Sequence, residues 1–442
     1  MDSKIIFHID VNSAYLSWTA VKMLNEGSTI DIRKIPAVIG GSRKTRHGVV
    51  LAKSVPAKKF GIVTGEPITN ALQKCPDIMI VPPEHDYYEM QSQKCMDLLS
   101  SFTPEIEQVS IDECYMDFSG IRNSYKTPLE AAYEIKDTIK NQLGFTVNIG
   151  ISDVKVLAKM ASDFTKPDKV HTLYRSEIKA KMWHLPVEEL FMAGKSSVDT
   201  LHKLGIFNIG QLAASPVNIL ESHMKSHGRI LWEYANGIDE SVVNITKEEV
   251  KGVGNSVTLP YDFEKIEEIS KVLLRLSEKV GGRLRSGAQM AKTIAVEVKY
   301  NDFTKVSKQT TIDKPTDSGT EIYKLSKELF SDLWNGKPIR LLGVRTANLV
   351  DDSEPEQMSI MDMFTGSLNL EKDGNNGKVI QTPSREKIKK LDKALDAIKE
   401  KYGEGSVLRA SLLNNEERRV KSEQTAAKKE IKRTEEGVYY EE

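Results

Sequence analysis

The chain has 442 residues, of which 39% are hydrophobic and 28% are charged, and its formal net charge is -1 at pH 7. This length predicts about three domains with tails, and the balanced charge excludes polyanion binding through a global field, which leaves local basic patches. Because no apolar run is long enough to span a membrane and Cys75, Cys95 and Cys114 lack paired spacing, we expect a soluble cytoplasmic protein with reduced thiols.

An apolar run over residues 5–11 predicts a buried strand that carries Asp10 near its end. A polar pair then precedes an apolar-rich helix that extends to about Leu24. An acid at the C-terminal end of a buried strand, just before a helix, is where α/β folds place chemistry. Tyr15 lies one turn into that helix, so both a core role and a role facing the site stay open. His8 is interpreted as a packed strand residue.

Residues 25–74 differ in character, because basic side chains accumulate around short apolar pieces and glycines. Two interpretations stay open: a solvated insertion rich in loops, or a small cationic lobe that handles phosphates. The basic residues are Arg33, Lys34, Arg43, Lys44, Arg46, His47, Lys53, Lys58 and Lys59.

Two short strands, at residues 107–111 and 114–118, are predicted around the adjacent acids Asp112 and Glu113. Neighbouring residues of a straight strand point to opposite faces, so two adjacent acids share a target only near a turn. The flanking apolar residues favour the end of a buried sheet over a solvated hairpin tip. Acids held together at low dielectric need a cation, which makes a divalent metal the natural partner. Asp117 lies further along the second strand and is interpreted as structural.

Helices are predicted at residues 87–102, 127–143 and 155–164, and a buried strand at 146–151. The order strand, helix, strand hairpin, helix, strand is typical of a split βαβ, ferredoxin-like sheet. Such a sheet places Asp10 beside the two adjacent acids on neighbouring strands. Three converging carboxylates suit two magnesium ions, which prefer a few carboxylates plus substrate phosphates to a full protein cage.

Five motifs follow one another along the chain. They are Phe7-His8-Ile9-Asp10-Val11-Asn12-Ser13-Ala14-Tyr15, Pro56-Ala57-Lys58-Lys59-Phe60-Gly61, Ser110-Ile111-Asp112-Glu113, Gly150-Ile151-Ser152 and Lys166-Pro167-Asp168. In this order and spacing they resemble the Y-family DNA polymerases, in the bacterial DNA polymerase IV and UmuC-like branch of translesion enzymes. The resemblance extends from Ile5 to about Val350. It implies an α+β multidomain protein with right-hand polymerase architecture: a ferredoxin-like palm, small fingers, a helical helix-hairpin-helix thumb and an α/β little finger.

By the same resemblance the chain divides into six segments. They are a palm in two parts at 1–24 and 79–172, fingers at 25–78, a thumb at 173–245, a little finger at 246–350 and a tail at 351–442.

The resemblance also implies that Asp10, Asp112 and Glu113 hold two Mg²⁺ ions, with the Val11 carbonyl as a further ligand. One ion would lower the pKa of the primer 3'-hydroxyl, and the other would bind the triphosphate and the leaving pyrophosphate.

Three side chains match nucleotide-contacting positions of the family. Tyr15 matches the steric-gate aromatic, whose ring occupies the place of a ribose 2'-hydroxyl. Lys166 matches the lysine that reaches the triphosphate, and Lys58 stands where many relatives have an arginine. Val55 replaces a phosphate-contacting tyrosine of many relatives, which removes one expected hydrogen bond to the triphosphate. A nearby arginine is a candidate to compensate.

The segment that contains Gly194, Lys195 and Gly205 resembles a helix-hairpin-helix, and these three residues are the expected DNA contacts. Such hairpins offer backbone amides and helix N-termini to DNA phosphates without reading bases. Met192 stands in the place of the usual first hairpin glycine. A P-loop is not expected, because Glu189 stands where its first glycine should be and no strand leads in.

Residues 251–350 hold 17 Lys or Arg against 12 Asp or Glu. A charge excess alone is typical of a solvated face. Together with the polymerase motifs it predicts a little finger that cradles DNA independently of sequence and with strong salt sensitivity. The predicted elements are helices at about 263–284 and 320–334 and strands at 293–300, 305–312 and 339–349.

A glutamine followed by apolar residues stands out in the polar tail. It resembles the motif by which bacterial polymerases dock in the sliding clamp, although a chance amphipathic segment stays an alternative. Its apolar pair is either Ile360-Met361 or Met363-Phe364. An amphipathic helix at about residues 382–403 either packs internally or binds a partner, and disorder is expected from about Asn414. The predicted clamp-binding residues are Gln357, Ile360, Met361, Met363 and Phe364.

We therefore expect a template-directed, magnesium-dependent DNA polymerase that performs error-prone translesion synthesis by transferring nucleotides from dNTPs to a primer 3'-hydroxyl. Its expected partners are primer-template DNA, dNTPs and the sliding clamp, in a cytoplasmic, nucleoid-associated bacterial monomer without a membrane partner. Two alternatives are a catalytically silent accessory protein that binds DNA and the clamp, and a nucleotidyl cyclase, which shares a two-metal palm. The complete set of acids argues against the first, and the basic little finger and the thumb hairpin argue against the second.

Overall fold

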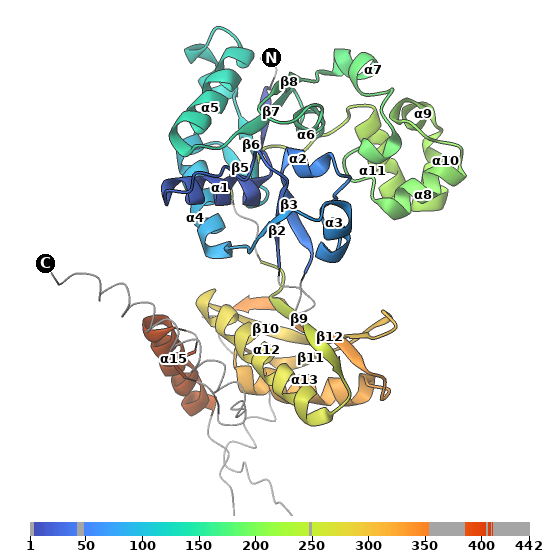
Figure 1. Ribbon diagram of the computed structural model, residues 1–442. Helices are drawn as coiled ribbons and strands as arrows, with labels where there is room; N and C mark the ends of the chain where they lie inside the picture. Colours follow the sequence, from blue (N-terminus) through green and yellow to red (C-terminus); the bar gives the residue numbers. More distant parts are fainter. Residues whose placement is uncertain are drawn as a thin grey trace, which may run out of the picture. The chain divides into compact units, whose positions relative to one another are not determined.

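The computed structural model describes residues 4–41, 48–246, 250–352, 385–403, 405–407 and 409. The chain divides into two compact units, Met1–Glu248 and Glu249–Glu442 (Figure 1). None of the helices within the described ranges combines the length and apolarity needed to cross a lipid bilayer. Arg43, Arg46, the predicted clamp-binding residues and the predicted disordered end lie outside the described residues.

β1 (Ile6–Val11) is the central strand of a five-stranded sheet, and all its residues are buried. It pairs antiparallel with β6 (Glu113–Asp117) on one side and with β7 (Val147–Ser152) on the other. β5 (Ile106–Gln108) pairs with β6, and β8 (Val170–Thr172) lies parallel to β7, so the order is β5-β6-β1-β7-β8. The predicted split βαβ order is confirmed, with β8 as an additional edge strand.

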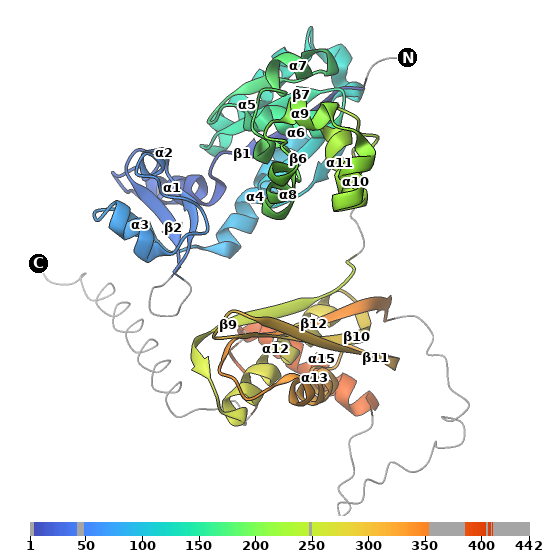
Figure 2. The ribbon, with the colours of Figure 1, turned by 90° about the vertical axis from the view of Figure 1, so that its right-hand side faces the viewer.

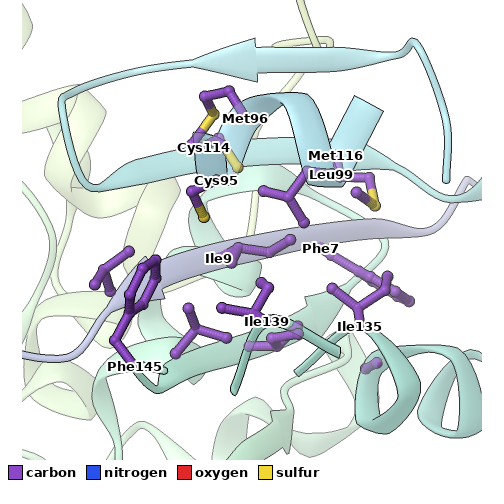
Figure 3. Close-up of a cluster of buried hydrophobic side chains, with 14 of the residues drawn as sticks. Phe7, Ile9, Cys95, Met96, Leu99, Cys114, Met116, Ile135, Ile139 and Phe145 are labelled. Carbon is purple, nitrogen blue, oxygen red and sulfur yellow. The ribbon is translucent and has the colours of Figure 1, made fainter. Parts of the chain in front are cut away.

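The main core of this unit lies on one face of the sheet. Alternate residues of β1, including Phe7 and Ile9, point into an apolar cluster together with side chains of the covering helices (Figure 3). Those helices are α1 (Ala14–Asn25), α4 (His85–Ser100) and α5 (Pro128–Leu143). Figure 3 shows Leu99 from α4 and Ile135 and Ile139 from α5 converging on the β1 side chains.

The ends of α5 show why this helix starts and stops where it does. Thr127 caps it by accepting a hydrogen bond from the Glu130 N–H at 3.1 Å, and Pro128 occupies the first turn, where its missing N–H costs nothing. Gly144 ends it with a φ of 77°, a left-handed conformation that favours glycine.

α6 (Lys155–Asp163) covers the opposite face of the sheet. It approaches β7 at Gly150, where a Cβ would collide with the Ala158 carbonyl and the Ser162 N–H. Since strand residues alternate between faces, His8 and Asp10 point toward α6, away from the apolar cluster. The fold therefore places the only acid of β1 under a helix that carries lysines.

Within residues 25–81, the described parts 25–41 and 48–81 form a folded lobe with a small core of its own, so the interpretation as a loop-rich insertion is wrong. Its sheet has the order β3-β2-β4, with β2 central. Val38, Val50 and Ile68 lie in its core. The elements are β2 (Ala37–Gly40), β3 (Val50–Lys53), α2 (Val55–Lys58), α3 (Ile68–Lys74) and β4 (Met79–Val81).

A short 3-10 helix, η2 (Ser119–Ser124), follows β6. After β8, the regular elements of the chain up to residue 235 are all helices. Leu201, Leu212 and Leu231 from three of these helices share one apolar core. The elements are η3 (Arg175–Glu177), α7 (Ile178–Lys181), η4 (Val187–Glu189), α8 (Lys195–Lys203), α9 (Ile209–Ala214), α10 (Val217–Met224) and α11 (Ser226–Ala235).

The second unit contains a four-stranded antiparallel sheet of order β11-β10-β12-β9, with two long helices on one side (Figure 2). The predicted helices and three of the strands are confirmed with small shifts of their ends. β9 was not predicted, because it is an edge strand that contains Pro260 and is mostly not buried. The elements are β9 (Gly254–Phe263), α12 (Ile266–Ser286), β10 (Gln289–Tyr300), β11 (Lys305–Thr316), α13 (Gly319–Leu333) and β12 (Ile339–Asp351).

α15 (Arg385–Tyr402) packs against the same unit, which resolves the two alternatives for this helix in favour of internal packing. Asp396 forms a two-pronged ion pair with Arg285 of α12, at 2.5 and 3.0 Å. The buried Asp392 accepts a hydrogen bond from Ser318 Oγ at 3.1 Å. Leu391, in contrast, is 57% exposed, so the helix is held by its acids and turns part of its apolar stripe outward.

Candidate active site

Three acids lie at the adjoining ends of β1 and β6. Asp10 and Glu113 are register partners across β1 and β6. The Val11 N–H donates to the Asp112 carbonyl at 3.0 Å, which holds the third acid beside the end of β1. The prediction that the sheet places these acids on neighbouring strands is confirmed.

Two lysines neutralise Asp10 and Glu113. Lys166 Nζ lies 2.8 Å from Asp10 Oδ1. Lys159 Nζ lies 2.7 Å from Glu113 Oε1 and 3.6 Å from Asp10 Oδ2. Lys166 was predicted as a site residue and Lys159 was not. The sequence signal that could have identified Lys159 is a lysine that stands among the apolar residues of α6. In the structure its side chain is only 11% exposed.

His8 joins this cluster from the middle of β1. Its ring packs against Tyr115, with ring centroids 4.8 Å apart, which agrees with a packed strand residue. Its Nε2 also lies 3.8 Å from Glu113 Oε2. Ser162 Oγ lies 2.8 Å from His8 Nδ1 and 2.8 Å from the Lys159 carbonyl oxygen. His8 therefore links α6 to the Glu113 carboxylate.

The pKa values of the Asp10 and Glu113 carboxyl groups are shifted in opposite directions. Burial raises the pKa of Asp10 to about 6, although Lys166 acts in the opposite direction. The contact with His8 lowers the pKa of Glu113, and the neighbouring Asp10 and Lys159 lower it further, although burial acts in the opposite direction. Burial disfavours the charged forms of both lysines, yet the adjacent acids raise the pKa of Lys159 and of Lys166. At neutral pH the site is a compact arrangement of alternating charges.

Asp112 has a different environment. Its Oδ1 accepts a hydrogen bond from Ser110 Oγ at 2.8 Å, and the same hydroxyl receives the Glu113 N–H at 3.1 Å. Across the part of the chain that the structure describes, no three His, Cys, Asp or Glu side chains gather closely enough to hold a metal ion. The structure thus brings the side chains of Asp10 and Glu113 together, while that of Asp112 is bonded within its own turn.

The donor chemistry of this site fits divalent cations of the magnesium type. Asp10, Asp112 and Glu113 offer hard carboxylate oxygens at adjoining strand ends, which are the ligands Mg²⁺ prefers. Ammonium groups stand beside two of these carboxylates, at the place where a cation offsets their buried charge. The Lys166 side chain is 34% exposed and long, so it can move aside when a stronger cation arrives.

Tyr15 is half-buried and packs against the apolar core cluster. Its ring stacks on the fully buried Tyr88, with centroids 4.5 Å apart and an interplanar angle of 13°. The Tyr88 hydroxyl lies 2.8 Å from Thr19 Oγ1 on the next turn of α1. Burial raises the pKa of Tyr15, and the Asp112 charge adds to that shift. The core contacts of the Tyr15 ring are thus established, and its role facing the site stays a prediction.

The folded lobe carries lysines on both sides of the short helix α2: Lys53 lies just before it, and Lys58 is its last residue. Lys58 is exposed, and Val55, three residues earlier, is 53% exposed. Burial lowers the pKa of Lys53, and the nearby Lys58 charge lowers it further. Two like charges held together in this way favour an anion between them.

The predicted hairpin of the helical region has the expected local backbone. Gly194 is the N-cap of α8, and Lys195 is its first residue. Gly205 follows that helix with a φ of 79°. Met192 has a φ of 68°, so it adopts the left-handed conformation for which glycine is the usual residue. The sequence-based suggestion that Met192 occupies a glycine position agrees with this backbone.

Comparison with known proteins gives a consistent result. Residues 9–163 match the model of the impB/mucB/samB family, and residues 250–360 match that of the impB/mucB/samB family C-terminal domain. The chain is 48% identical over 416 residues to a DNA polymerase IV of Clostridium acetobutylicum, covering 94% of this chain and 100% of that protein. It is 33% identical over 421 residues to DNA polymerase IV 2 of Bacillus subtilis, covering 93% and 95% respectively.

Among solved structures, the chain is similar to a Y-family DNA polymerase chimera, Dbh-Dpo4(243-245)-Dbh. The TM-score is 0.67 at 24% sequence identity, and the match covers 78% of this chain and 99% of the chimera. This likeness shows the fold of a Y-family polymerase with its right-hand architecture.

Proposed function

Because this chain belongs to the DNA polymerase IV family, we propose that it is a template-directed DNA polymerase that performs error-prone translesion synthesis. The reaction transfers a nucleotide from a dNTP to a primer 3'-hydroxyl and releases pyrophosphate. The observation that carries the proposal for this chain is the pairing of Asp10 with Glu113 across β1 and β6, with Lys166 on Asp10.

In this proposal Asp10, Asp112 and Glu113 hold two magnesium ions, with the Val11 carbonyl as a further ligand. Bound there, the ions supply positive charge that lowers the pKa of the primer 3'-hydroxyl and offsets the charge on the triphosphate. The protein contributes by holding Asp10 and Glu113 in register before substrate arrives, so no reorganisation of the sheet is needed at the moment of reaction. His8 and Lys159 keep the Glu113 carboxylate ionised and oriented.

The nucleotide is bound by side chains around the acids. Lys166 exchanges its interaction with Asp10 for one with the triphosphate, which is the more highly charged partner. Lys58 and the adjacent Lys53 approach the triphosphate from the lobe formed by residues 25–81 and compensate for the phenol hydroxyl that Val55 does not provide. The Tyr15 ring, held flat against Tyr88, excludes a ribose 2'-hydroxyl.

DNA is bound by the remaining surfaces. Gly194 and Lys195 contact a DNA phosphate at the start of α8, and Gly205 contacts DNA from the turn that follows this helix. In the second unit, the face of the sheet opposite α12 and α13 has a depression lined in part by Asn255 and Arg345. Polar and cationic groups of this kind bind the DNA backbone without reading its sequence.

The proposal also includes a protein partner, an oligomeric state and a location in the cell. A bacterial sliding clamp binds Gln357, with either Ile360-Met361 or Met363-Phe364 as the apolar pair. The enzyme acts as a monomer in the cytoplasm, associated with the nucleoid.

Primer extension with magnesium, dNTPs and a primer-template tests this function. Asp112→Asn keeps the size of the side chain but removes its charge, so extension should fall by ~10³-fold or more, while DNA binding measured by gel shift stays within about threefold. Asp117→Asn is the matched control, because Asp117 accepts the Ser119 N–H at 2.9 Å further along the same strand and should retain activity.

The same experiment separates the alternatives. A silent accessory protein would give no extension with the wild-type chain, and a cyclase would consume nucleotide in a control without template. Normal extension by Asp112→Asn would remove this residue from the site.

A further inference from the structure

We propose that Asn148, together with Asn12, is a positioning residue for nucleotide binding. The two amides hold the backbone on both sides of Lys166, so that its ammonium group stands where the triphosphate binds. This inference rests on the proposed function and assigns to it two residues that bear no charge and lie behind the site.

Asn148 lies in β7 and is fully buried. Its Nδ2 donates to the carbonyls of Ser162, at 3.0 Å, and Thr165, at 2.7 Å. Its Oδ1 accepts from Asn12 Nδ2 at 3.1 Å and from the Lys169 N–H at 3.2 Å. All four hydrogen-bonding positions of the amide are used. Because two acceptors face the nitrogen and two donors face the oxygen, only one orientation of the amide satisfies the surroundings.

Asn12 completes the arrangement from the end of β1. Its Oδ1 accepts from the Asp168 N–H at 2.9 Å and from Thr146 Oγ1 at 3.0 Å. Thr165 precedes Lys166, and Asp168 and Lys169 follow it. The two amides therefore fix the segment that carries Lys166 immediately before and shortly after this lysine.

The segment has further attachments. The Lys169 carbonyl accepts the Ile149 N–H at 2.9 Å, and His171 Nε2 lies 3.2 Å from the Thr165 carbonyl oxygen. The Asp168 carboxylate pairs with Lys136 at 2.8 Å and with Lys140 at 2.7 Å, on α5. These ion pairs lie toward the surface and hold Asp168 after Lys166. Before Lys166, the Asn148 amide donates to the Thr165 carbonyl at 2.7 Å. Removal of that amide takes away this bond to β7, and the carbonyl of the buried Ser162 loses its 3.0 Å hydrogen bond from Asn148.

The position of Lys166 matters because its ammonium group must balance two sites. It lies 2.8 Å from Asp10 and 2.9 Å from Asp163, and in the proposed function it transfers part of this interaction to the triphosphate. A displacement of about 1 Å in a charged contact of this kind is large enough to weaken binding substantially. Asn148 acts on the nucleotide only through Lys166.

The test is single-nucleotide incorporation by the full chain at varied dNTP concentration. Asn148→Ala should raise KM for dNTP about tenfold and change kcat by less than about threefold, as expected when binding of the phosphate is weakened. Asn12 follows the end of β1, and Asn12→Ala removes its hydrogen bond from the Asp168 N–H. This variant should also raise KM for dNTP. It also keeps the test available should Asn148→Ala fold poorly.

Ser152→Ala is the matched control. Ser152 lies on the same strand, is fully buried, and donates to the Leu173 carbonyl at 2.6 Å, far from Lys166 in the register of β7. Its replacement should lower the melting temperature to a similar extent while KM for dNTP stays within about twofold. A general weakening of the sheet would instead raise KM in both variants and contradict the proposal.

A mutant cycle separates positioning from general damage. In a Lys166→Ala background, Asn148→Ala should raise KM by no more than about twofold further, since the side chain it positions is absent. A full tenfold increase in that background would overturn the inference. If Lys166→Ala raises KM for dNTP but neither asparagine variant does, the inference is overturned and the proposed function stays intact. Absence of extension by the wild-type chain, in contrast, would remove both.

Discussion

At Asp10, burial raises the carboxyl pKa from 3.8 to about 6. A folded-state pKa above the unfolded value gives stability that is fully present below pH 3.8 and is lost as pH rises through about 6. The ionised carboxylate therefore costs stability at neutral pH when no stronger cation is bound. Replacing Asp10 by Asn should stabilise the chain at pH 8 in the presence of a chelator by about 2–3 kcal/mol.

Urea unfolding at pH 8 and pH 4 measures this effect. The gain should disappear at pH 4, where the wild-type carboxyl is protonated in the folded state. Asp77→Asn, at an exposed position of the same unit, is the control and should show little change at either pH. A variant less stable than the wild type at pH 8 would mean that the ion pair with Lys166 outweighs the cost of burial.

The acids, Tyr15 and Lys166 could be predicted because they lie in short motifs. Lys159 and Asn148 could not, because their roles arise from contacts between distant parts of the chain. The Lys159 contact with Glu113 joins residues 46 positions apart. The contact between Asn12 and Asn148 spans 136 positions. A polar residue in a buried strand or an apolar helix is a signal that it has a partner, but its spacing does not identify that partner.

Among the elements, α15 shows that an amphipathic pattern predicts a helix but not the contacts that hold the helix in place. The stripe of apolar residues indicates a helix, yet the structure holds this helix by Asp392 and Asp396, while Leu391 is 57% exposed. Arg285 receives these acids and also donates to the Asp317 carbonyl at 2.7 Å. Helix periodicity predicts the element, whereas the ion pairs that dock it join residues 111 positions apart.

Removing one partner of this contact should destabilise the second unit. Asp396→Ala leaves the Arg285 guanidinium, whose side chain is 11% exposed, with one strong acceptor fewer, at a cost of about 1–3 kcal/mol. Chemical unfolding of the full chain, followed by a probe in the second unit, measures the change. Lys393→Ala, at an exposed position of the same helix, should change stability by less than about 0.5 kcal/mol. Equal effects of the two substitutions would mean that the ion pair does not dock α15.

At the scale of the whole molecule, the candidate chemistry and the predicted clamp contact belong to different compact units. Asp10 and Glu113 lie in Met1–Glu248, and the segment with the clamp motif lies in Glu249–Glu442. That segment runs between the end of β12 and the start of α15, two elements of one unit. The five-stranded sheet needs no residue of the clamp motif for its order or its register. Nucleotide transfer and clamp binding should therefore be separable by mutation.

Deleting Gln357–Phe364 should leave distributive primer extension within about twofold of wild type and abolish its stimulation by a bacterial sliding clamp, because tethering acts through effective concentration at the primer end. Extension on long primed templates, with and without loaded clamp, measures both quantities. Deleting Leu370–Gly377, a stretch of equal length in the same tail, is the control and should keep the stimulation. Paired alanines at Ile360-Met361 and at Met363-Phe364 then identify the apolar pair, since only one should reproduce the deletion. Stimulation that survives the first deletion would place the clamp contact elsewhere in the chain.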